Sequence, residues 1–248
     1  NVDAQLSDVD LLLTAQDLAI NNIHGDLLFD FKKGFSAKNL TGELWGKPIK
    51  ASINGKNGDK LQFTSRINHQ SLQDWLKLPE FNFLNGEMAV KGTLNWGKTA
   101  SAIHISSNLQ GMALELPEPL GKTHDQRLNV EFNLPLTGVK RELKISSDEG
   151  LNLQFLMGEQ GIEAGLISLG LTDNAYRPGY IVARGHLLHA NVQQWINVVN
   201  RYNGFREQAI KAENSQRLIA DIDGIHIRNL DLYGYTMQDA RFFASDKL

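Results

Sequence analysis

The chain alternates apolar and polar residues over most of its length. Clear examples are residues 61–67, 88–96 and 128–134, where apolar side chains fall mostly on every second position. This period of two is typical of β-strands that bury one face and expose the other. Turn signals, many of them containing glycine, separate the strands at intervals of roughly 8 to 12 residues. The pattern predicts a mainly β protein built as a long antiparallel meander, which forms a curved, elongated sheet or groove.

Two segments break this alternation and predict short helices. The first covers about 69–78, with Ser71 as its expected N-cap. The second covers about 190–204, with Asn191 as its N-cap and a terminal glycine of the kind that often follows a helix. Residues 205–217 are expected either to continue as a further helix or to form an exposed link.

The two predicted helices resemble each other in sequence. Residues 69–76 (HQSLQDWL) align without a gap with residues 189–196 (HANVQQWI), 120 positions later. A match of this kind indicates a repeated structural unit. The tryptophan of each copy, Trp75 and Trp195, is expected to plug the sheet as a core residue rather than to stack on a ligand.

This repeat suggests a division of the chain into units. Residues 1–80 form a β unit that ends in a short helix, and residues 81–217 form a second β unit that ends in a longer helix. Residues 218–248 are expected to begin a third β unit, with a turn at Asp223-Gly224 between two of its strands. The sequence starts without Met in what already reads as a strand, so we interpret it as a fragment of a longer protein.

Composition and charge narrow the classes of function. A hydrophobic content of 42% is typical of a folded protein, and 25 basic against 28 acidic residues leave no basic surface for nucleic acid. The absence of cysteine excludes disulfides, thiolate metal sites and a cysteine nucleophile. No run approaches the roughly 18 apolar residues that a membrane-spanning helix needs.

Candidate chemistry is sparse, and we expect neither an enzyme nor a cofactor or metal site. No common catalytic or phosphate-binding motif occurs. His186 and His189 lie three positions apart, which places them on opposite faces of a strand and makes them a poor pair of metal ligands. His69 and His189 precede the two helices, where a structural role is expected. Two further pairs share a strand face and are interpreted as solvent-facing positions: His24 with Asp26, and Asp221 with Asp223.

A large sheet with one apolar face must bury that face against another part of the structure or against a ligand. A closed barrel, a two-sheet sandwich and an open curved sheet around an apolar ligand would each do so. An open apolar groove would be a binding site, because large exposed apolar patches are rare on proteins without a partner. Ten side chains are candidates to line such a groove: Leu61, Phe63, Ile67, Met88, Val90, Leu94, Leu128, Val130, Phe132 and Leu134.

Three segments carry a family resemblance. Residues 107–122 (SNLQGMALELPEPLGK) resemble the S-x-L-x-G … L-P-x-P-x-G-K element of large AsmA-like proteins of the YhdP type. Residues 38–49 resemble their recurrent L-x-G-x-x-x-G-x-P hairpin, and residues 224–234 resemble the start of their late β-repeats. The matches run from about residue 23 to residue 243, and the proline-containing element is the most specific of them.

The resemblance implies a Gram-negative envelope protein, anchored in the inner membrane by a helix outside this fragment and otherwise located in the periplasm. Proteins of this kind are similar to repeating β-groove lipid-transfer proteins. The resemblance therefore implies non-enzymatic transfer of phospholipid between the inner and outer membranes, with acyl chains in an apolar groove, in support of the outer-membrane barrier. The alternative is a structural or protein-interaction β module that binds envelope protein partners without conducting lipid.

Overall fold

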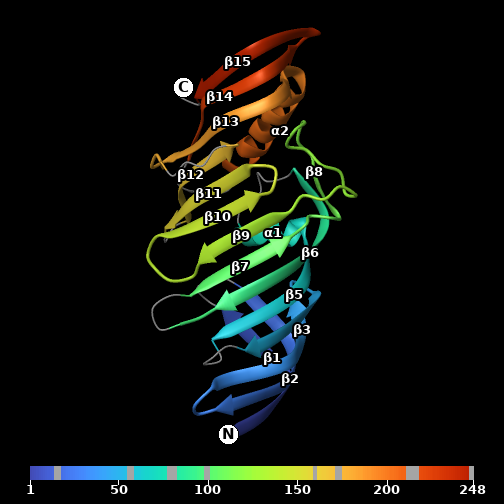
Figure 1. Cartoon of the computed structure of the whole chain (residues 1–248), viewed down its shortest axis with the longest axis vertical. Coiled ribbons are helices and arrows are strands. Elements are labelled where there is room, and N and C mark those ends of the chain that lie inside the picture. Colours follow the sequence, from blue (N-terminus) through green and yellow to red (C-terminus); the bar gives the residue numbers. More distant parts are fainter. Residues whose placement is uncertain are drawn as a thin grey trace.

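The computed structural model shows one curved, elongated sheet with two helices (Figure 1). It describes residues 1–13, 18–54, 59–76, 83–97, 101–158, 161–170, 175–210 and 218–245. The strands of this described part are β1 (Val2–Leu13), β2 (Leu18–Asp30), β3 (Gly34–Leu44), β4 (Lys47–Asn54), β5 (Lys60–Asn68), β6 (Leu84–Asn95), β7 (Ala102–Ser107), β8 (Met112–Leu114), β9 (Val130–Pro135), β10 (Arg141–Ser147), β11 (Leu151–Gly158), β12 (Gly161–Leu169), β13 (Tyr180–Asn191), β14 (Ile219–Leu232) and β15 (Tyr235–Ser245). The helices are α1 (His69–Leu76) and α2 (Val192–Ile210).

Strands that follow one another in the sequence are neighbours in the sheet. The order runs from β1 to β15 without exchange, except that β8 leaves the path and pairs with β6. This confirms the predicted mainly β, elongated and curved sheet. Two pairings, β12 with β13 and β13 with β14, are parallel, so the sheet is mixed rather than purely antiparallel. The second follows from α2, because a helical crossover brings the chain back to the end of the sheet from which it left.

Helix α1 begins two residues earlier than its expected cap. The side-chain oxygen of Asn68, not that of Ser71, accepts the backbone N–H that a cap satisfies: Ser71 N donates to Asn68 Oδ1 at 2.7 Å. Asn68 is the last residue of β5, so strand and helix follow each other directly. The predicted end of this helix, residues 77 and 78, lies outside the described residues.

Helix α2 is longer than predicted and starts later. Ala190 and Asn191 still belong to β13, and Asn191 is the N-cap as expected, because Gln194 N donates to its Oδ1 at 3.1 Å. The helix then continues through Gly204 to Ile210. A glycine inside a helix costs only about 1 kcal/mol, and the following residues 206–209 (REQA) are good helix formers. The first part of 205–217 therefore continues the helix, and residues 211–217 lie outside the described part.

The predicted turn at Asp223-Gly224 is wrong. Both residues lie within the single strand β14, where the pairing with β15 shifts between Asp223 and Ile225. Gly224 has a φ of +75°, a conformation that glycine adopts without steric cost. The glycine signal thus marks a β-bulge, which inserts one extra residue and bends the strand without ending it.

The strand register divides the middle of the sheet, from β4 to β9, into two faces of different chemistry. The apolar face carries one unbroken row of paired residues across β4, β5, β6, β7 and β9: Ile53, Leu61, Leu94, Ile103 and Leu134. The opposite, polar face carries the residues between them, as in the paired row Lys50, Thr64, Lys91, Ser106 and Glu131.

The polar face is covered over β10 to β13. The segment that enters β13 crosses it: Tyr176 donates its hydroxyl hydrogen to Glu142 of β10, and Arg184 of β13 donates to the Ala175 carbonyl at 3.4 Å. Burial and the neighbouring carboxylate raise the pKa of the Tyr176 hydroxyl. Three residues of β12 on this face are fully buried in consequence: Ala164, Leu166 and Ser168. Simple alternation gives way here to a strand buried on both sides.

Candidate functional site: the apolar face of the sheet

The structure places nine of the ten groove candidates on the apolar face. The register pairs Leu61 with Leu94, Ile67 with Met88, and Phe132 with Ile105, and alternation adds their strand neighbours. The nine are Leu61, Phe63, Ile67, Met88, Val90, Leu94, Val130, Phe132 and Leu134. Leu128 precedes β9 and is buried with Leu109 and Met112 of the connection between β7 and β9, in a cluster against which Met88 and Val130 of the apolar face also pack.

This face is uniform in chemistry over the middle of the sheet. From Ile49 of β4 to Leu134 of β9, the paired positions on this side carry only apolar residues, glycine and serine. A surface of this kind shelters apolar groups from water at roughly 25 cal/mol per Å² and offers no charged or acidic group for catalysis. The middle of this face is therefore a continuous apolar surface.

Helix α1 lies on the apolar face, which is the concave side of the curved sheet. The Trp75 ring lies 5.9 Å from the ring of Trp45, in the turn between β3 and β4. Trp75 also packs against the buried cluster of Leu134, Leu143 and Phe155 on β9, β10 and β11. One side chain thus touches parts of the sheet that are at least four strands apart, about 19 Å in a flat sheet. The sheet bends toward this face, as the ribbon shows (Figure 1).

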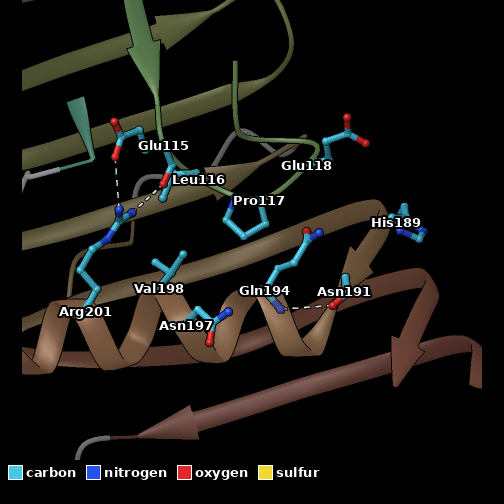
Figure 2. A pocket seen from close by; sticks show the side chains of 10 residues that line it. All are labelled: Glu115, Leu116, Pro117, Glu118, His189, Asn191, Gln194, Asn197, Val198 and Arg201. Atoms are coloured by element: carbon cyan, nitrogen blue, oxygen red, sulfur yellow. Dashed lines mark hydrogen bonds and ion pairs between the residues drawn. The ribbon is translucent and has the colours of Figure 1, made fainter. Parts of the chain in front are cut away.

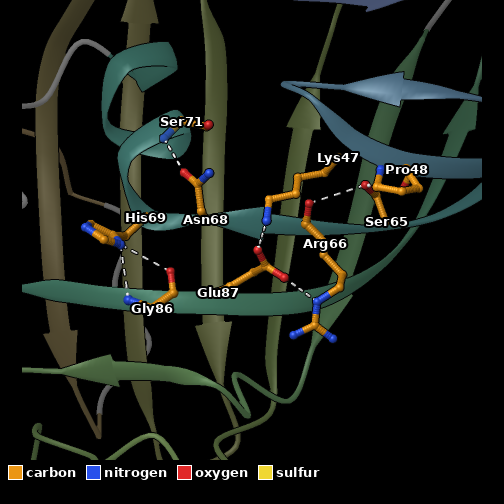
Figure 3. A network of polar contacts seen from close by, with 9 residues as sticks. All are labelled: Lys47, Pro48, Ser65, Arg66, Asn68, His69, Ser71, Gly86 and Glu87. Carbon is orange, nitrogen blue, oxygen red and sulfur yellow. Dashed lines mark hydrogen bonds and ion pairs between the residues drawn. The ribbon is translucent and has the colours of Figure 1, made fainter. Parts of the chain in front are cut away.

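Polar contacts with β5 and β6 fix the start of α1 (Figure 3). His69 Nδ1 accepts the backbone N–H of Gly86 at 3.1 Å, which ties the first helical residue to β6. The adjacent Glu87 forms ion pairs with Lys47 and Arg66. Hydrogen bonds from Lys47 and Arg66 lower the pKa of the Glu87 carboxyl, so these pairs are intact at neutral pH and weaken as the pH falls through that lowered pKa.

Helix α2 covers the same face farther along the sheet. Val192 and Trp195 pack against the cluster of Leu169, Leu187, Ala190, Ile227 and Leu230. Leu120, from the connection between β7 and β9, packs against the same cluster. The two helical tryptophans therefore contact apolar clusters on one and the same face.

The connection between β7 and β9 (residues 108–129) supplies the third cover. Between it and α2 lies a pocket of about 610 Å³, whose walls come from residues 115–118 and one side of the helix (Figure 2). Arg201 closes one end, because it donates to the Glu115 backbone carbonyl at 2.6 Å and pairs with the Glu115 carboxylate at 3.3 Å. Asn85 donates to the other carboxylate oxygen of Glu115 at 3.0 Å. The lining mixes polar side chains with Leu116, Pro117 and Val198, so this pocket differs in chemistry from the uniformly apolar middle of the face.

The Lys122 ammonium holds this connection together. It donates to the carbonyls of Leu109 and Thr123, each at 2.9 Å, and to that of Met112. A Cβ at Gly121 would lie 1.9 Å from the Leu116 carbonyl oxygen, so only glycine fits there. The Leu-Pro-x-Pro-Leu-Gly-Lys element therefore has a structural role, since its residues fold the connection over the apolar face.

The apolar face is open at both ends of the sheet. Near β1, the side chains of Val2, Leu11 and Phe35 are 52%, 44% and 44% exposed. On β15, Met237 and Phe242 are 49% and 45% exposed. Exposed apolar side chains thus lie at both ends of this face. In between, α1, α2 and the connection between β7 and β9 cover it.

A hollow of about 600 Å³ on the polar face has a different lining. Three lysines, Lys38, Lys50 and Lys91, surround it together with threonine, serine, amide and histidine residues, and its lining includes no carboxylate. Leu40, Ala51, Phe63 and Gly92 also contribute to the lining. Such a surface cannot exclude water around an apolar chain. This lining therefore differs in chemistry from the apolar face on the other side of the sheet.

The histidines are placed differently from one another. His69 lies in α1, whereas His189 lies in β13 with its Nε2 3.5 Å from an Asp231 oxygen, so the aligned pair does not share one environment. His186 faces His226 of the neighbouring strand. Within the described ranges, no group of three or more His, Cys, Asp or Glu is arranged to hold a metal ion, and no described helix is long and apolar enough to cross a membrane.

One test of the packing on this face uses Gly92 and Phe63. The Phe63 ring lies over Gly92, and a Cβ there would come within 2.0 Å of it. Gly92→Ala is expected to displace the ring and lower the free energy of unfolding by about 1–3 kcal/mol. Urea unfolding of both single variants and of Gly92→Ala with Phe63→Leu checks this. The double variant should recover part of the loss, and purely additive losses would contradict the contact.

Comparison with known proteins gives one match. A protein-family model described as "YhdP protein" covers residues 1–248. No curated protein and no solved structure matches the chain. The family match confirms the resemblance seen in the sequence.

Proposed function

Because the chain belongs to the YhdP protein family, we propose that it carries phospholipid acyl chains along its apolar face, as part of a periplasmic bridge between the inner and outer membranes. The family suggests an envelope role related to lipid transport. The finer steps, phospholipid as cargo and transfer in support of the outer-membrane barrier, are our proposal. The observation that carries it is the unbroken apolar face, which curls inward and is open at both ends.

The proposed mechanism needs no chemical step. Each lipid CH₂ that leaves water for this face gains roughly 0.8 kcal/mol. Movement along the face replaces one methylene contact by another, so the free energy of a bound chain changes little as it slides. The headgroup stays in water, because the polar atoms of a phospholipid gain nothing from an apolar lining.

Helices α1 and α2 limit the path that an acyl chain can take along the apolar face. Trp75 and Trp195 lie on the apolar face, so an acyl chain must run beside the two helices or displace them. The same covers favour a second candidate, a structural envelope module that does not conduct lipid and binds protein partners. In that case the middle of the face is permanently packed.

Photocrosslinking in living Gram-negative cells separates the two candidates. A photoreactive residue is placed at Phe63 or Phe132 on the apolar face, and, as matched controls, at the adjacent Thr64 or Asn133 on the polar face. Lipid transfer predicts phospholipid adducts at the first two positions and not at the controls. Adducts at none of the four positions, or equally at all of them, would contradict it.

A further inference from the structure

Two imidazoles meet on the polar face, away from the surface discussed so far. His186 of β13 and His226 of β14 are paired in register on neighbouring parallel strands. Their Nδ1 atoms lie 3.3 Å apart, and the rings stand edge to face with their centroids separated by 5.5 Å and an angle of 86° between them. Both nitrogens therefore point at the same small volume.

The separation of the two nitrogens suits a shared metal ion. Zinc binds imidazole nitrogen at about 2.0–2.1 Å with tetrahedral angles, which places two ligand nitrogens about 3.3 Å apart. Square-planar coordination would require about 2.9 Å. A direct N–H···N hydrogen bond between the two rings is the alternative at this distance, and it requires one of the two Nδ1 atoms to carry a proton. The observed 3.3 Å agrees with the tetrahedral case.

The far nitrogen of His226 has a carboxylate beside it. Asp239 Oδ1 lies 3.4 Å from His226 Nε2 and comes from the edge strand β15, where Asp239 adopts a φ of 54°. A carboxylate at one ring nitrogen favours the proton there and leaves the lone pair of the other nitrogen free to bind a metal. Two cations, Arg184 on the same strand and Arg241 opposite His226, oppose metal binding and limit its affinity.

We propose that His186 and His226 form a binding site for a divalent transition-metal ion, with Zn²⁺ the best fit and water completing the coordination. With two protein ligands the site binds more weakly than a four-ligand structural zinc site. It is independent of lipid transfer, since it lies on the opposite face. Metal held here would join β13 to β14, the strands linked through α2.

The test is calorimetric titration of the tag-free protein with Zn²⁺ at neutral pH. One ion is expected per chain. His186→Ala and His226→Ala should abolish binding over the same concentration range, and Asp239→Asn should weaken it by roughly tenfold. His189→Ala is the matched control, because this histidine lies on the same strand beside its own carboxylate, Asp231, and binding should be unchanged.

Nuclear magnetic resonance of the wild-type protein supplies a readout that does not depend on how well the variants fold. Zn²⁺ should shift the ring signals of His186 and His226 together and leave those of His189 in place. Absence of Zn²⁺ binding by the wild type overturns the proposal. Binding that persists in both His186→Ala and His226→Ala, or ring shifts confined to other histidines, overturns it as well.

Discussion

Replacing Lys122 with Met is expected to lower the free energy of unfolding by about 3 kcal/mol. The Lys122 side chain is buried, with 9% of its surface exposed, and its ammonium has three hydrogens. Each one is used by a backbone carbonyl, those of Leu109, Met112 and Thr123. Methionine keeps an apolar stem of similar length and removes all three donors. The loss then reflects carbonyls left with poorer hydrogen bonding in a buried site.

Burial lowers the pKa of Lys122, and the charge of the nearby Asp125 opposes that shift. The matched control is Lys91→Met, because Lys91 is an exposed lysine of the polar face and its loss should change stability by no more than about 0.5 kcal/mol. Urea unfolding measures both variants. Amide hydrogen exchange at Met112 and Leu114 then shows whether the connection between β7 and β9 opens first. Equal unfolding midpoints for the two variants would contradict the assigned role.

The residues of a strand that share one face were predictable, because the alternation depends only on neighbouring positions in the sequence. In β5, Leu61, Phe63 and Ile67 fall on one side by geometry alone, whatever the partner strand, so sequence was sufficient to group them. Pairing with the next strand along the chain then follows from short connections. The same locality explains why Asn191 was identified correctly as a cap, since its partner Gln194 lies three residues away.

Contacts between distant residues were not predictable from one sequence. His226 is 40 residues from His186, and the two meet only because β13 and β14 are parallel, which depends on the crossover through α2. Trp45 and Trp75 meet only because the sheet curls. The repeated His and Trp suggested two equivalent helices. The cap lies seven residues before Trp75 and four before Trp195, so the two helices start in different registers relative to the repeat.

Glycine signals were the other source of error. Gly224 was predicted to lie in a turn, yet it lies inside β14 at a positive φ, and Gly204, predicted to follow the second helix, lies inside α2. A glycine indicates only that a positive φ is permitted at that position. Whether the chain turns, bulges or continues depends on how the flanking residues pair with neighbouring strands. A bulge and a hairpin carry the same local signal and differ only in what the next residues pair with.

Replacing Phe132 with Asp should reduce phospholipid binding at least about tenfold. Phe132 lies on the apolar face, paired with Ile105 on one side and Ile145 on the other. An acyl chain lying over a carboxylate at this position would strip it of water, at a cost of several kcal/mol. Because 1.4 kcal/mol already corresponds to a tenfold change in affinity, partial loss of hydration suffices for the expected effect.

The matched control is Asn133→Asp, which adds the same charge one residue away on the polar face, between His104 and Lys144. Binding of a radiolabelled phospholipid to purified protein measures both variants, and Phe132→Leu, which keeps the face apolar, should bind like the wild type. Circular dichroism shows whether the sheet of Phe132→Asp remains folded. If that variant is folded and binds lipid as well as Asn133→Asp does, acyl chains do not use this part of the apolar face. Loss confined to Phe132→Asp supports their passage along it, because Asn133→Asp controls for the added charge and Phe132→Leu controls for loss of the aromatic ring.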